Sequence, residues 1–538
     1  MSIELVAEGQ AAGVPLHHFW NTCVGAGRAA EGLRASWLEH MEVAVKHCGF
    51  RYVRFHGLFH DDMFVYRVKD GGVTFNFQYV DELFDRLLAI GIRPFVELGF
   101  CPSDLASEKG TVFWWKANGA PPTDLAKWAE LVRRFVTHLI ARYGRDEVVT
   151  WYFEVWNEPN LAPFFRGTKS QYFELYQASV RTIKAIEPRL RVGGPATSNF
   201  VPDARFEGET EDKAQHRLVT TAKDLDALVW KPVWLEQFFA YCEREKLPVD
   251  FVSVHPYPTD WALDEHGTGM KLTRGVDATA KDLALVRNMV RASAFSQAEI
   301  HLTEWSSSSS SRDYTHDYLQ AATYVVKANV ESIGLVDSLA YWTFTDVFEE
   351  EGAGDTAFHG GFGLINFQGI PKPTFHAYRF LNALGDLVLA RPPGGIVTRH
   401  SATGEITALA YHYPPQMPFT VPASFGSRAK AEETLNLGRP ELLRIDLAGL
   451  RPFQPIVLET LARGAGDAMG AWEKLGSPEP LSREQTRQLR EAARATLREA
   501  FSADASGRFR FERAIAPWSV VLLRTFQSAE QNPAGKAP

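Results

Sequence analysis

Between residues 16 and 384 the chain alternates short apolar runs with amphipathic stretches. The runs are rich in β-branched and aromatic residues, as buried parallel strands are, and the stretches between them carry apolar residues at helical spacing. The predicted strands are 16–24, 51–56, 93–98, 151–155, 191–194, 251–255, 299–304 and 338–342. The helices expected after them are 33–48, 79–90, 124–143, 170–186, 233–245, 280–294, 318–331 and 373–384. This alternation predicts an α/β fold, a closed (β/α)8 or TIM barrel.

The pattern changes after residue 387. Short alternating runs at 406–411, 441–445 and 518–524 are separated by turns rich in proline and glycine, which predicts an accessory C-terminal β-sandwich domain. A single helix is expected to interrupt it at 482–501. The predicted domains are therefore a catalytic barrel at 14–386 and a sandwich at 387–526, followed by a disordered polar tail at 527–538.

Composition excludes several classes of partner. The net charge of −8 is spread without long runs, which argues against nucleic acid and against an anionic membrane surface. The chain has no apolar stretch long enough to span a membrane, and its first ten residues do not resemble a signal peptide, so a cytoplasmic location is expected. The four cysteines (Cys23, Cys48, Cys101 and Cys242) show no metal-binding spacing and are predicted to be buried free thiols.

Polar and aromatic side chains gather at the ends of the predicted strands. A TIM barrel carries its ligand chemistry at the carboxyl ends of its strands. The residues at these positions are His56, Asn157, Glu158, His255, Tyr257, Glu304 and Trp342, and Asp346, Glu349 and Glu350 follow just beyond the eighth strand. One such residue is most simply a satisfied core group, but so many from five strands predict a binding site at one rim.

Two carboxylates on this rim suggest a specific chemistry. Glu158 follows an aromatic strand and lies within the sequence Asn–Glu–Pro, and Glu304 ends the seventh strand. Glycosidic cleavage needs one group to protonate the leaving oxygen and another to trap the positive anomeric carbon. We assign Glu158 as acid/base, with a pKa raised by its aromatic frame and by Glu304, and Glu304 as nucleophile. Asn157 can donate its amide to a sugar 2-hydroxyl, and this chemistry requires no cofactor and no metal.

The chain resembles the glycoside hydrolase family 39 β-xylosidases throughout the predicted barrel. The segments that carry the resemblance are CVGAGR, VRFHG, GIRPFVELGF, FEVWNEPN, VGGPA, VDFVSVHPY, HLTEW, YWTFTDVFEE, FHGGFGL and IPKPTFHAY. The resemblance implies the same two roles for Glu158 and Glu304. It also implies that His56, Asn157, His255, Tyr257, Trp342, Glu349 and Glu350 line the subsite for the non-reducing sugar, and that Trp114, Trp115 and Phe165 shape its rim. Finally, it places residues 1–13 in the sandwich.

The expected function is that of a retaining exo-β-1,4-xylosidase, which releases D-xylose from the non-reducing ends of xylo-oligosaccharides. One alternative keeps the mechanism but acts on an α-L-arabinoside or an α-L-iduronide; another is a non-catalytic carbohydrate-binding protein. Two segments depart from the family pattern. The six serines at 306–311 could form a solvated connection or a polar wall for the leaving group, and the insertion at 202–231 could cover the rim or a subunit interface. A homo-oligomer is therefore an open possibility.

Overall fold

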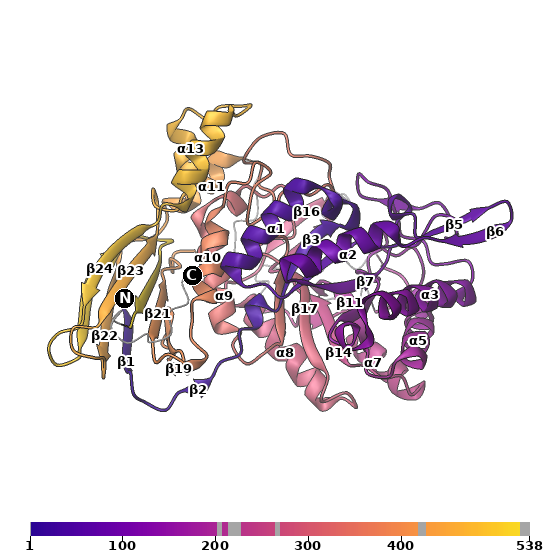
Figure 1. Ribbon diagram of the computed structural model, residues 1–538, viewed down its shortest axis with the longest axis horizontal. Coiled ribbons are helices and arrows are strands. Elements are labelled where there is room, and N and C mark those ends of the chain that lie inside the picture. The colour runs from indigo at the N-terminus through magenta and orange to yellow at the C-terminus, as the bar shows by residue number, and fades with distance from the viewer. Residues whose placement is uncertain (1, 202–206, 213–226, 264–268, 418–426, 528–538) are drawn as a thin grey trace.

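The computed structural model describes residues 2–201, 207–212, 227–263, 269–417 and 427–527, with 259–263 and 269–273 described by their backbone alone. At its centre is a closed barrel of eight parallel strands with helices around it, and the sandwich lies at one end, beside α9 and α10 (Figure 1). The barrel strands are β3 (Cys23–Arg28), β4 (Tyr52–His56), β7 (Arg93–Leu98), β10 (Tyr152–Val155), β11 (Arg191–Ser198), β14 (Phe251–His255), β17 (Glu299–Trp305) and β18 (Ser338–Tyr341). They follow one another around the barrel in chain order, and β18 closes it against β3.

Helices cover the outside of the barrel, and most of the longer ones bury an apolar stripe against it. They are α1 (Ala35–Cys48), α2 (Gln78–Ile90), α3 (Leu125–Tyr143), α4 (Arg145–Val148), α5 (Lys169–Ile186), α7 (Leu235–Arg244), α8 (Ala278–Ala292), α9 (Leu319–Glu331) and α10 (Pro373–Asn382). Local signals set their ends. The Asp124 carboxylate caps α3 by accepting from the Ala126 amide at 2.7 Å, and α1 ends at Gly49, whose positive φ suits a glycine.

The barrel interior is built in layers, because alternate residues of each strand point inward. The amino-terminal layer is a plug of packed rings, in which Phe95 stacks on Tyr152 at 4.7 Å and Phe251 meets both edge-on. The next layer is charged and polar, made of Arg54, Glu97, Glu154, Ser253 and Thr303, all of them buried. The apolar plug therefore supports a polar floor on which the rim residues stand.

Two sheets form the sandwich. One sheet contains β1 (Ser2–Glu8), β22 (Glu441–Ala448) and β25 (Phe509–Ile515); the other contains β2 (Val14–Pro15), β19 (Leu387–Ala390), β20 (Gly395–Arg399), β21 (Ile406–Tyr411), β26 (Val520–Thr525), β23 (Pro455–Leu461) and β24 (Leu497–Ser502). Their facing side chains, among them Leu5, Ile445 and Leu523, form a separate core. The expected fold class, a TIM barrel with an accessory sandwich, is confirmed. The exact domain limits stay a prediction.

Short helices and hairpins decorate this framework. Three helices belong to the C-terminal part, namely α11 (Arg428–Leu435), α12 (Ala468–Lys474) and α13 (Arg483–Arg494), and α11 and α13 stand above the sandwich in Figure 1. Two-stranded hairpins are formed by β5 (Tyr66–Lys69) with β6 (Gly72–Phe75), β8 (Thr111–Val112) with β9 (Ala117–Asn118), β12 (Phe200–Val201) with β13 (Lys231–Pro232), and β15 (Thr259–Leu263) with β16 (Gly269–Thr273). The hairpin of β5 and β6 follows the second barrel strand and projects away from the barrel (Figure 1).

Two element predictions were wrong. The first strand begins at Cys23 rather than residue 16, because Phe19–Asn21 form a turn of 3-10 helix whose apolar side chains are buried in the core. The helix expected at 482–501 ends at Arg494. Leu497–Ser502 instead form β24, which pairs with β23 along its length, so tertiary pairing overrides helix-favouring residues such as Glu499 and Ala500.

Other expectations can be checked in part. The four cysteines are free and buried, as predicted. No helix within the described ranges is both long enough and apolar enough to cross a bilayer. Of the insertion at 202–231 the structure describes 207–212 and 227–231, where Glu209 accepts from the Ser170 amide at the start of α5. The rest of that insertion, and the tail after Gln527, lie outside the described residues.

Candidate active site

A cavity of about 170 Å³ opens at the carboxyl ends of the barrel strands. Its lining residues are His56, Phe113, Asn157, Glu158, Leu161, Phe164, Ser198, Asn199, Tyr257, Glu304, Ser309, Trp342, Glu350 and Phe362. The cavity brings together seven of the residues predicted from the sequence, drawn from the ends of β4, β10, β14, β17 and β18. Its wall is aromatic and its floor polar, as in many sites for small polar ligands.

The backbone after β10 places Glu158. Trp156 and Glu158 both adopt positive φ, at 70° and 44°, a region that non-glycine residues occupy only when neighbouring structure holds them there. The Trp156 amide donates to the Leu98 carbonyl at 3.2 Å, and the Glu158 amide donates to the Ala196 carbonyl at 3.0 Å. These bonds to strands on either side turn the chain sharply at the rim, so that the Glu158 side chain enters the cavity.

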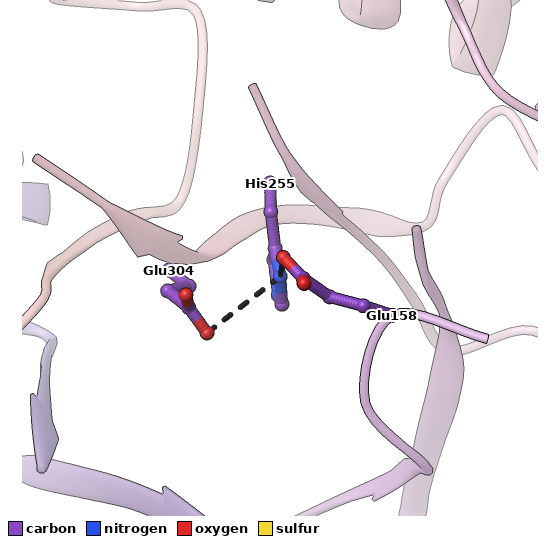
Figure 2. A group of neighbouring side chains, drawn as sticks. All are labelled: Glu158, His255 and Glu304. Carbon is purple, nitrogen blue, oxygen red and sulfur yellow. Dashed lines mark hydrogen bonds and ion pairs between the residues drawn. The ribbon is translucent and has the colours of Figure 1, made fainter. Parts of the chain in front are cut away.

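Glu158 and Glu304 face one another at the base of the cavity. One oxygen from each carboxyl group, together with a ring nitrogen of His255, lies within 4.8 Å of the others. Figure 2 shows the carboxyl groups approaching from opposite sides, with the His255 imidazole between them. Retaining glycosidases hold their two carboxyl groups about 5–5.5 Å apart, whereas inverting enzymes leave a wider gap for a water molecule. The spacing suits direct attack by one carboxylate on the anomeric carbon.

The surroundings of Glu158 favour its protonated form. Burial is the main cause, and it raises the pKa of Glu158 to about 7. A hydrogen bond from Ser198 and the charges of His56 and Arg54 act in the opposite direction, while the charge of Glu97 adds to the rise. The sequence had suggested Glu304 and the aromatic frame as causes, but the loss of solvent around a carboxyl group that is only 5% exposed matters most.

Glu304 has the partners of a carboxylate. Tyr257 donates its hydroxyl to Oε1 at 2.8 Å, and Arg54 Nη1 donates to Oε2 at 3.3 Å. Burial and the neighbouring Glu158 raise the pKa of Glu304, while His255, His56 and Arg54 oppose that rise. Since its donors include a guanidinium, Glu304 is the group of the pair whose surroundings best accommodate a negative charge.

Arg54 is a central residue that the sequence analysis did not identify. Its fully buried guanidinium contacts Glu154 at 2.6 Å, Glu97 at 3.0 Å and the Asn157 Oδ1 at 2.8 Å, in addition to Glu304. A usable signal was present, because Arg54 lies two residues before His56 in the same strand and therefore points to the same face. Arg54 lies one layer below the strand ends, from which the expected site residues come.

The predicted subsite residues divide into three groups: those that line the cavity, His255 just below its surface, and those outside it. His56, Trp342 and Glu350 line the cavity, with His56 Nδ1 bonded to Glu97 at 2.7 Å and His56 Nε2 at 3.7 Å from Glu350. Trp342 lies against β3 where Gly25 leaves room, since a Cβ there would come within 2.3 Å of the ring. Burial, together with Glu304 and Glu158, raises the pKa of Glu350 well above its usual range. His255 lies one layer below the cavity surface, bonded to Glu158.

The structure places the other predicted residues outside the cavity. Glu349 is held by Arg28 at 2.9 Å and by Arg34 at 2.7 Å, which keep its pKa low, although burial acts against them. Trp114 is 63% exposed, whereas Trp115 and Phe165 are buried behind the wall. The rings that do form the wall are Phe113, Phe164 and Phe362. Phe113 and Phe164 each directly precede a predicted rim residue, so the sequence identified the correct loops but the wrong rings.

The serine run is part of the packed structure. Ser306, Ser307 and Ser308 are completely buried, and Ser306 Oγ lies 3.3 Å from His316 Nε2. The prediction of a solvated connection is therefore wrong for these residues, because the 3-10 helix Tyr314–Asp317 packs over them. Ser309 alone lines the cavity, so the polar-wall alternative applies to that residue.

Glu158, His255 and Glu304 could in principle bind a metal ion, since their ligand atoms are close enough. Two features make this arrangement a better acid/base pair than a cation site. The atoms already have partners, with Glu158 bonded to His255 at 2.9 Å and Glu304 bonded to Tyr257. A cation placed between them would also be repelled by the Arg54 guanidinium, which contacts Glu304.

Comparison with known proteins agrees with this geometry. The family model "Glycosyl hydrolases family 39" matches residues 1–510. A β-xylosidase from Geobacillus stearothermophilus is 40% identical over 402 residues, 73% of either chain, and one from Caldicellulosiruptor saccharolyticus is 33% identical over 94% of this chain and 95% of its own. The crystal structure of a monomeric β-xylosidase from Caulobacter crescentus CB15 superposes with a TM-score of 0.82 at 32% identity, covering 97% of this chain and 99% of that one. This chain therefore belongs to glycosyl hydrolase family 39.

Proposed function

We propose that this glycoside hydrolase is a retaining exo-β-1,4-xylosidase that releases D-xylose from the non-reducing ends of xylo-oligosaccharides. The observation that carries the mechanism is the approach of Glu158 and Glu304 to within 4.8 Å in one cavity. The sugar identity is supported by the β-xylosidases that the chain resembles over most of its length.

In the first step Glu304 attacks the anomeric carbon while Glu158 gives its proton to the departing glycosidic oxygen. The bond from the anomeric carbon to the leaving oxygen breaks, and an ester bond to Glu304 forms. Asn157 is oriented to help, because Arg54 Nη2 holds its Oδ1 and leaves the amide N–H groups free to bind the sugar 2-hydroxyl. Such a contact stabilises the transition state more than the ground state when it strengthens as charge develops.

In the second step water replaces the leaving group. Esterification removes the negative charge of Glu304, whose carboxyl oxygen lies within 4.8 Å of one from Glu158, so the pKa of Glu158 falls and Glu158 stays ionised to accept a proton from water. The resulting hydroxide attacks the anomeric carbon and releases Glu304 as a carboxylate. Two inversions at the same carbon return the sugar to its original configuration.

The shape and charge of the cavity support a short neutral sugar. At about 170 Å³ it is smaller than the sites of about 300–1,000 Å³ that take drug-sized ligands, which suits one terminal ring and an exo mode of action. Among the described residues that line it, none is Lys or Arg, whereas Glu350 is present. A uronate such as α-L-iduronide would need a basic partner for its carboxylate, so this substrate is disfavoured.

Hydrolysis of three aryl glycosides tests the proposal. We expect the 4-nitrophenyl β-D-xyloside to be cleaved at a kcat/KM at least about tenfold above the α-L-arabinofuranoside and the α-L-iduronide, a difference of about 1.4 kcal/mol in transition-state binding. Proton NMR of the first product should show β-xylose before mutarotation. A preference for either other sugar would overturn the substrate, first-formed α-xylose would overturn the retaining mechanism, and binding without turnover would indicate a carbohydrate-binding protein.

Whether the chain forms a homo-oligomer stays a prediction.

A further inference from the structure

A chain of hydrogen bonds runs under the cavity floor from Glu158 to Arg54. Glu158 Oε1 lies 2.9 Å from His255 Nδ1, and His255 Nε2 lies 2.9 Å from the Thr303 hydroxyl. Thr303 Oγ1 lies 2.8 Å from Glu154 Oε1, and Glu154 Oε2 accepts from Arg54 Nε at 2.6 Å. His255, Thr303 and Glu154 are fully buried, so water does not compete for their hydrogen bonds.

The direction of each bond follows from what its atoms can donate. Glu154 forms an ion pair with Arg54 and, as a carboxylate, can only accept. The single Thr303 proton must therefore go to Glu154, and the Thr303 oxygen is left to accept from His255 Nε2. A neutral imidazole has only one N–H, so when Nε2 carries it, Nδ1 has a lone pair. Two carboxyl oxygens face His255 Nδ1, Glu158 Oε1 at 2.9 Å and Glu304 Oε2 at 3.7 Å, and only the first is at hydrogen-bond distance. Glu158 Oε1 must then supply the proton of that bond.

We propose that Thr303 and Glu154 are positioning residues that fix His255 as its Nε2–H tautomer, so that Nδ1 accepts a hydrogen bond from protonated Glu158. This inference rests on the proposed function for its catalytic meaning, whereas the bond directions follow from the Arg54–Glu154 ion pair, the Thr303 hydroxyl and a neutral His255. In Figure 2 the imidazole lies between the carboxyl groups of Glu158 and Glu304. Neither Thr303 nor Glu154 touches the cavity, so both act through His255.

The neutral state of His255 is favoured by its environment. Burial lowers the pKa of His255 to about 4, with the Arg54 charge contributing, although Glu304 and Glu154 oppose the shift. When Glu158 loses its proton, its oxygen and the Nδ1 lone pair face each other at hydrogen-bond distance without a proton between them. We call the chain of hydrogen bonds from Glu158 through His255 and Thr303 to Glu154 the relay. The relay disfavours ionised Glu158, which keeps the proton available for the leaving group. It also makes the ionised form a stronger base for the second step.

Other groups also act on Glu158 and must be separated from the relay. The titratable and charged groups that face it are His255 and Tyr257 from β14 and the loop after it, Glu304 from β17, Arg54 and His56 from β4, Glu97 from β7, and Glu350 after β18. A substitution that keeps all of these charges unchanged is therefore needed. Thr303→Val meets this condition, since it removes one hydroxyl and nearly preserves the volume.

Kinetics of Thr303→Val, with Thr303→Ser as the matched control, test the relay. Without the Thr303 oxygen, His255 is free to move its proton to Nδ1 and donate to the Glu158 carboxylate, which lowers the pKa of Glu158. We expect the alkaline limb of kcat/KM for a xyloside with a poor leaving group to move down by about one pH unit in Thr303→Val. The limb should stay in place in Thr303→Ser, which keeps the hydroxyl. An unmoved limb in Thr303→Val, or an equal shift in both variants, would overturn the relay.

A measurement that does not depend on activity decides the same question. In protein labelled with ¹⁵N-histidine, the two ring nitrogens of His255 have distinct shifts, and His255→Asn identifies which signals belong to it. We expect a protonated Nε2 and an unprotonated Nδ1 at pH 6 in the unmodified protein. A protonated Nδ1 would overturn the proposal even if Thr303→Val failed to fold. If the protein hydrolysed no glycoside, the proposed function would fail while this spectrum still tested the tautomer.

Discussion

The two sides of the cavity floor treat chemically identical carboxyl groups differently. On the β17 side, Glu304 receives a phenol hydroxyl and an arginine N–H, both of which favour the charged form. On the β10 side, Glu158 faces the imidazole of His255 in a buried position, and its pKa rises to about 7. The difference teaches that partners from other strands can set two like carboxyl groups apart, and it supports the proposed roles of Glu158 as acid and Glu304 as nucleophile.

Removal of the nucleophile should have the largest effect. Glu304→Gln keeps the size of the side chain but cannot form the glycosyl ester, so we expect kcat/KM to fall by about 10⁴-fold or more, as for the loss of a nucleophile in other enzymes. The measurement is steady-state hydrolysis of an aryl β-D-xyloside. In Glu304→Ala, which does remove the bulk of the carboxyl group, added azide can take its place and should give the α-glycosyl azide. A β-glycosyl azide from this variant would contradict the assignment.

Removal of the acid should have the next largest effect, and one that depends on the leaving group. Glu158→Gln cannot protonate the departing oxygen, so xylobiose hydrolysis should fall by about 10²–10⁴-fold. The first step with a dinitrophenyl xyloside needs no proton and should slow far less, and azide should here give the β-glycosyl azide. The measurement is kcat/KM against leaving-group pKa. Equal losses on xylobiose and on the dinitrophenyl substrate would show that Glu158 is not the acid.

Removal of the Arg54 guanidinium should affect Glu304 on β17 more than Glu158, and it should also reduce the stability of the protein. Arg54→Met leaves Glu154, Glu97 and Glu304 buried without their guanidinium, and we expect the free energy of unfolding to drop by about 3–5 kcal/mol. Urea unfolding measures this loss. Arg487→Met, which removes exposed ion pairs with Glu484 and Glu491 on α13, is the matched control and should leave the midpoint unchanged. Equal stability of the two variants would contradict a central role for Arg54.

The smallest predicted effect is the pH dependence of kcat/KM, which reports the ionisation of both Glu158 and Glu304. Glu158 must be protonated for the first step, so kcat/KM should decline as pH rises through about 7. Glu304 must be ionised, so activity should decline as pH falls through the pKa of Glu304, which burial raises above its usual value. Glu158→Gln should lose the alkaline limb and keep the acid limb on a dinitrophenyl xyloside. Retention of the alkaline limb in that variant would assign it to another group.

Much of the fold could be predicted because buried parallel strands are marked by apolar runs that few other structures share. The eight strands and their helices follow that signal, and the rim residues follow from the rule that a barrel binds ligands at its strand ends. The failures have physical causes. Phe19 and Trp20 gave an apolar signal through core packing without strand pairing, and 497–502 are rich in helix formers yet pair with β23.

The site was predictable at its surface and not beneath it. Glu158 and Glu304 were expected at the site because they stand at or just beyond the end of a strand, whereas Arg54, Glu154 and Thr303 lie one layer deeper, where the strand-end rule does not point. Glu349 and Glu350 are adjacent in the chain, but only Glu350 lines the cavity, since Arg28 and Arg34 hold Glu349 outside it. Such choices depend on side chains from other strands, and a single sequence does not reveal these partners.

The central claim is that Glu304 forms a covalent bond to the sugar while Glu158 handles the proton. A dinitrophenyl 2-deoxy-2-fluoro-β-D-xyloside tests it most directly, because fluorine slows both steps and the good leaving group keeps the first one fast enough for the ester to accumulate. Mass spectrometry of the digested protein should place one fluoroxylosyl group on the peptide that contains Glu304. A label on Glu158, or no adduct in an enzyme that still hydrolyses xylosides, would contradict this account.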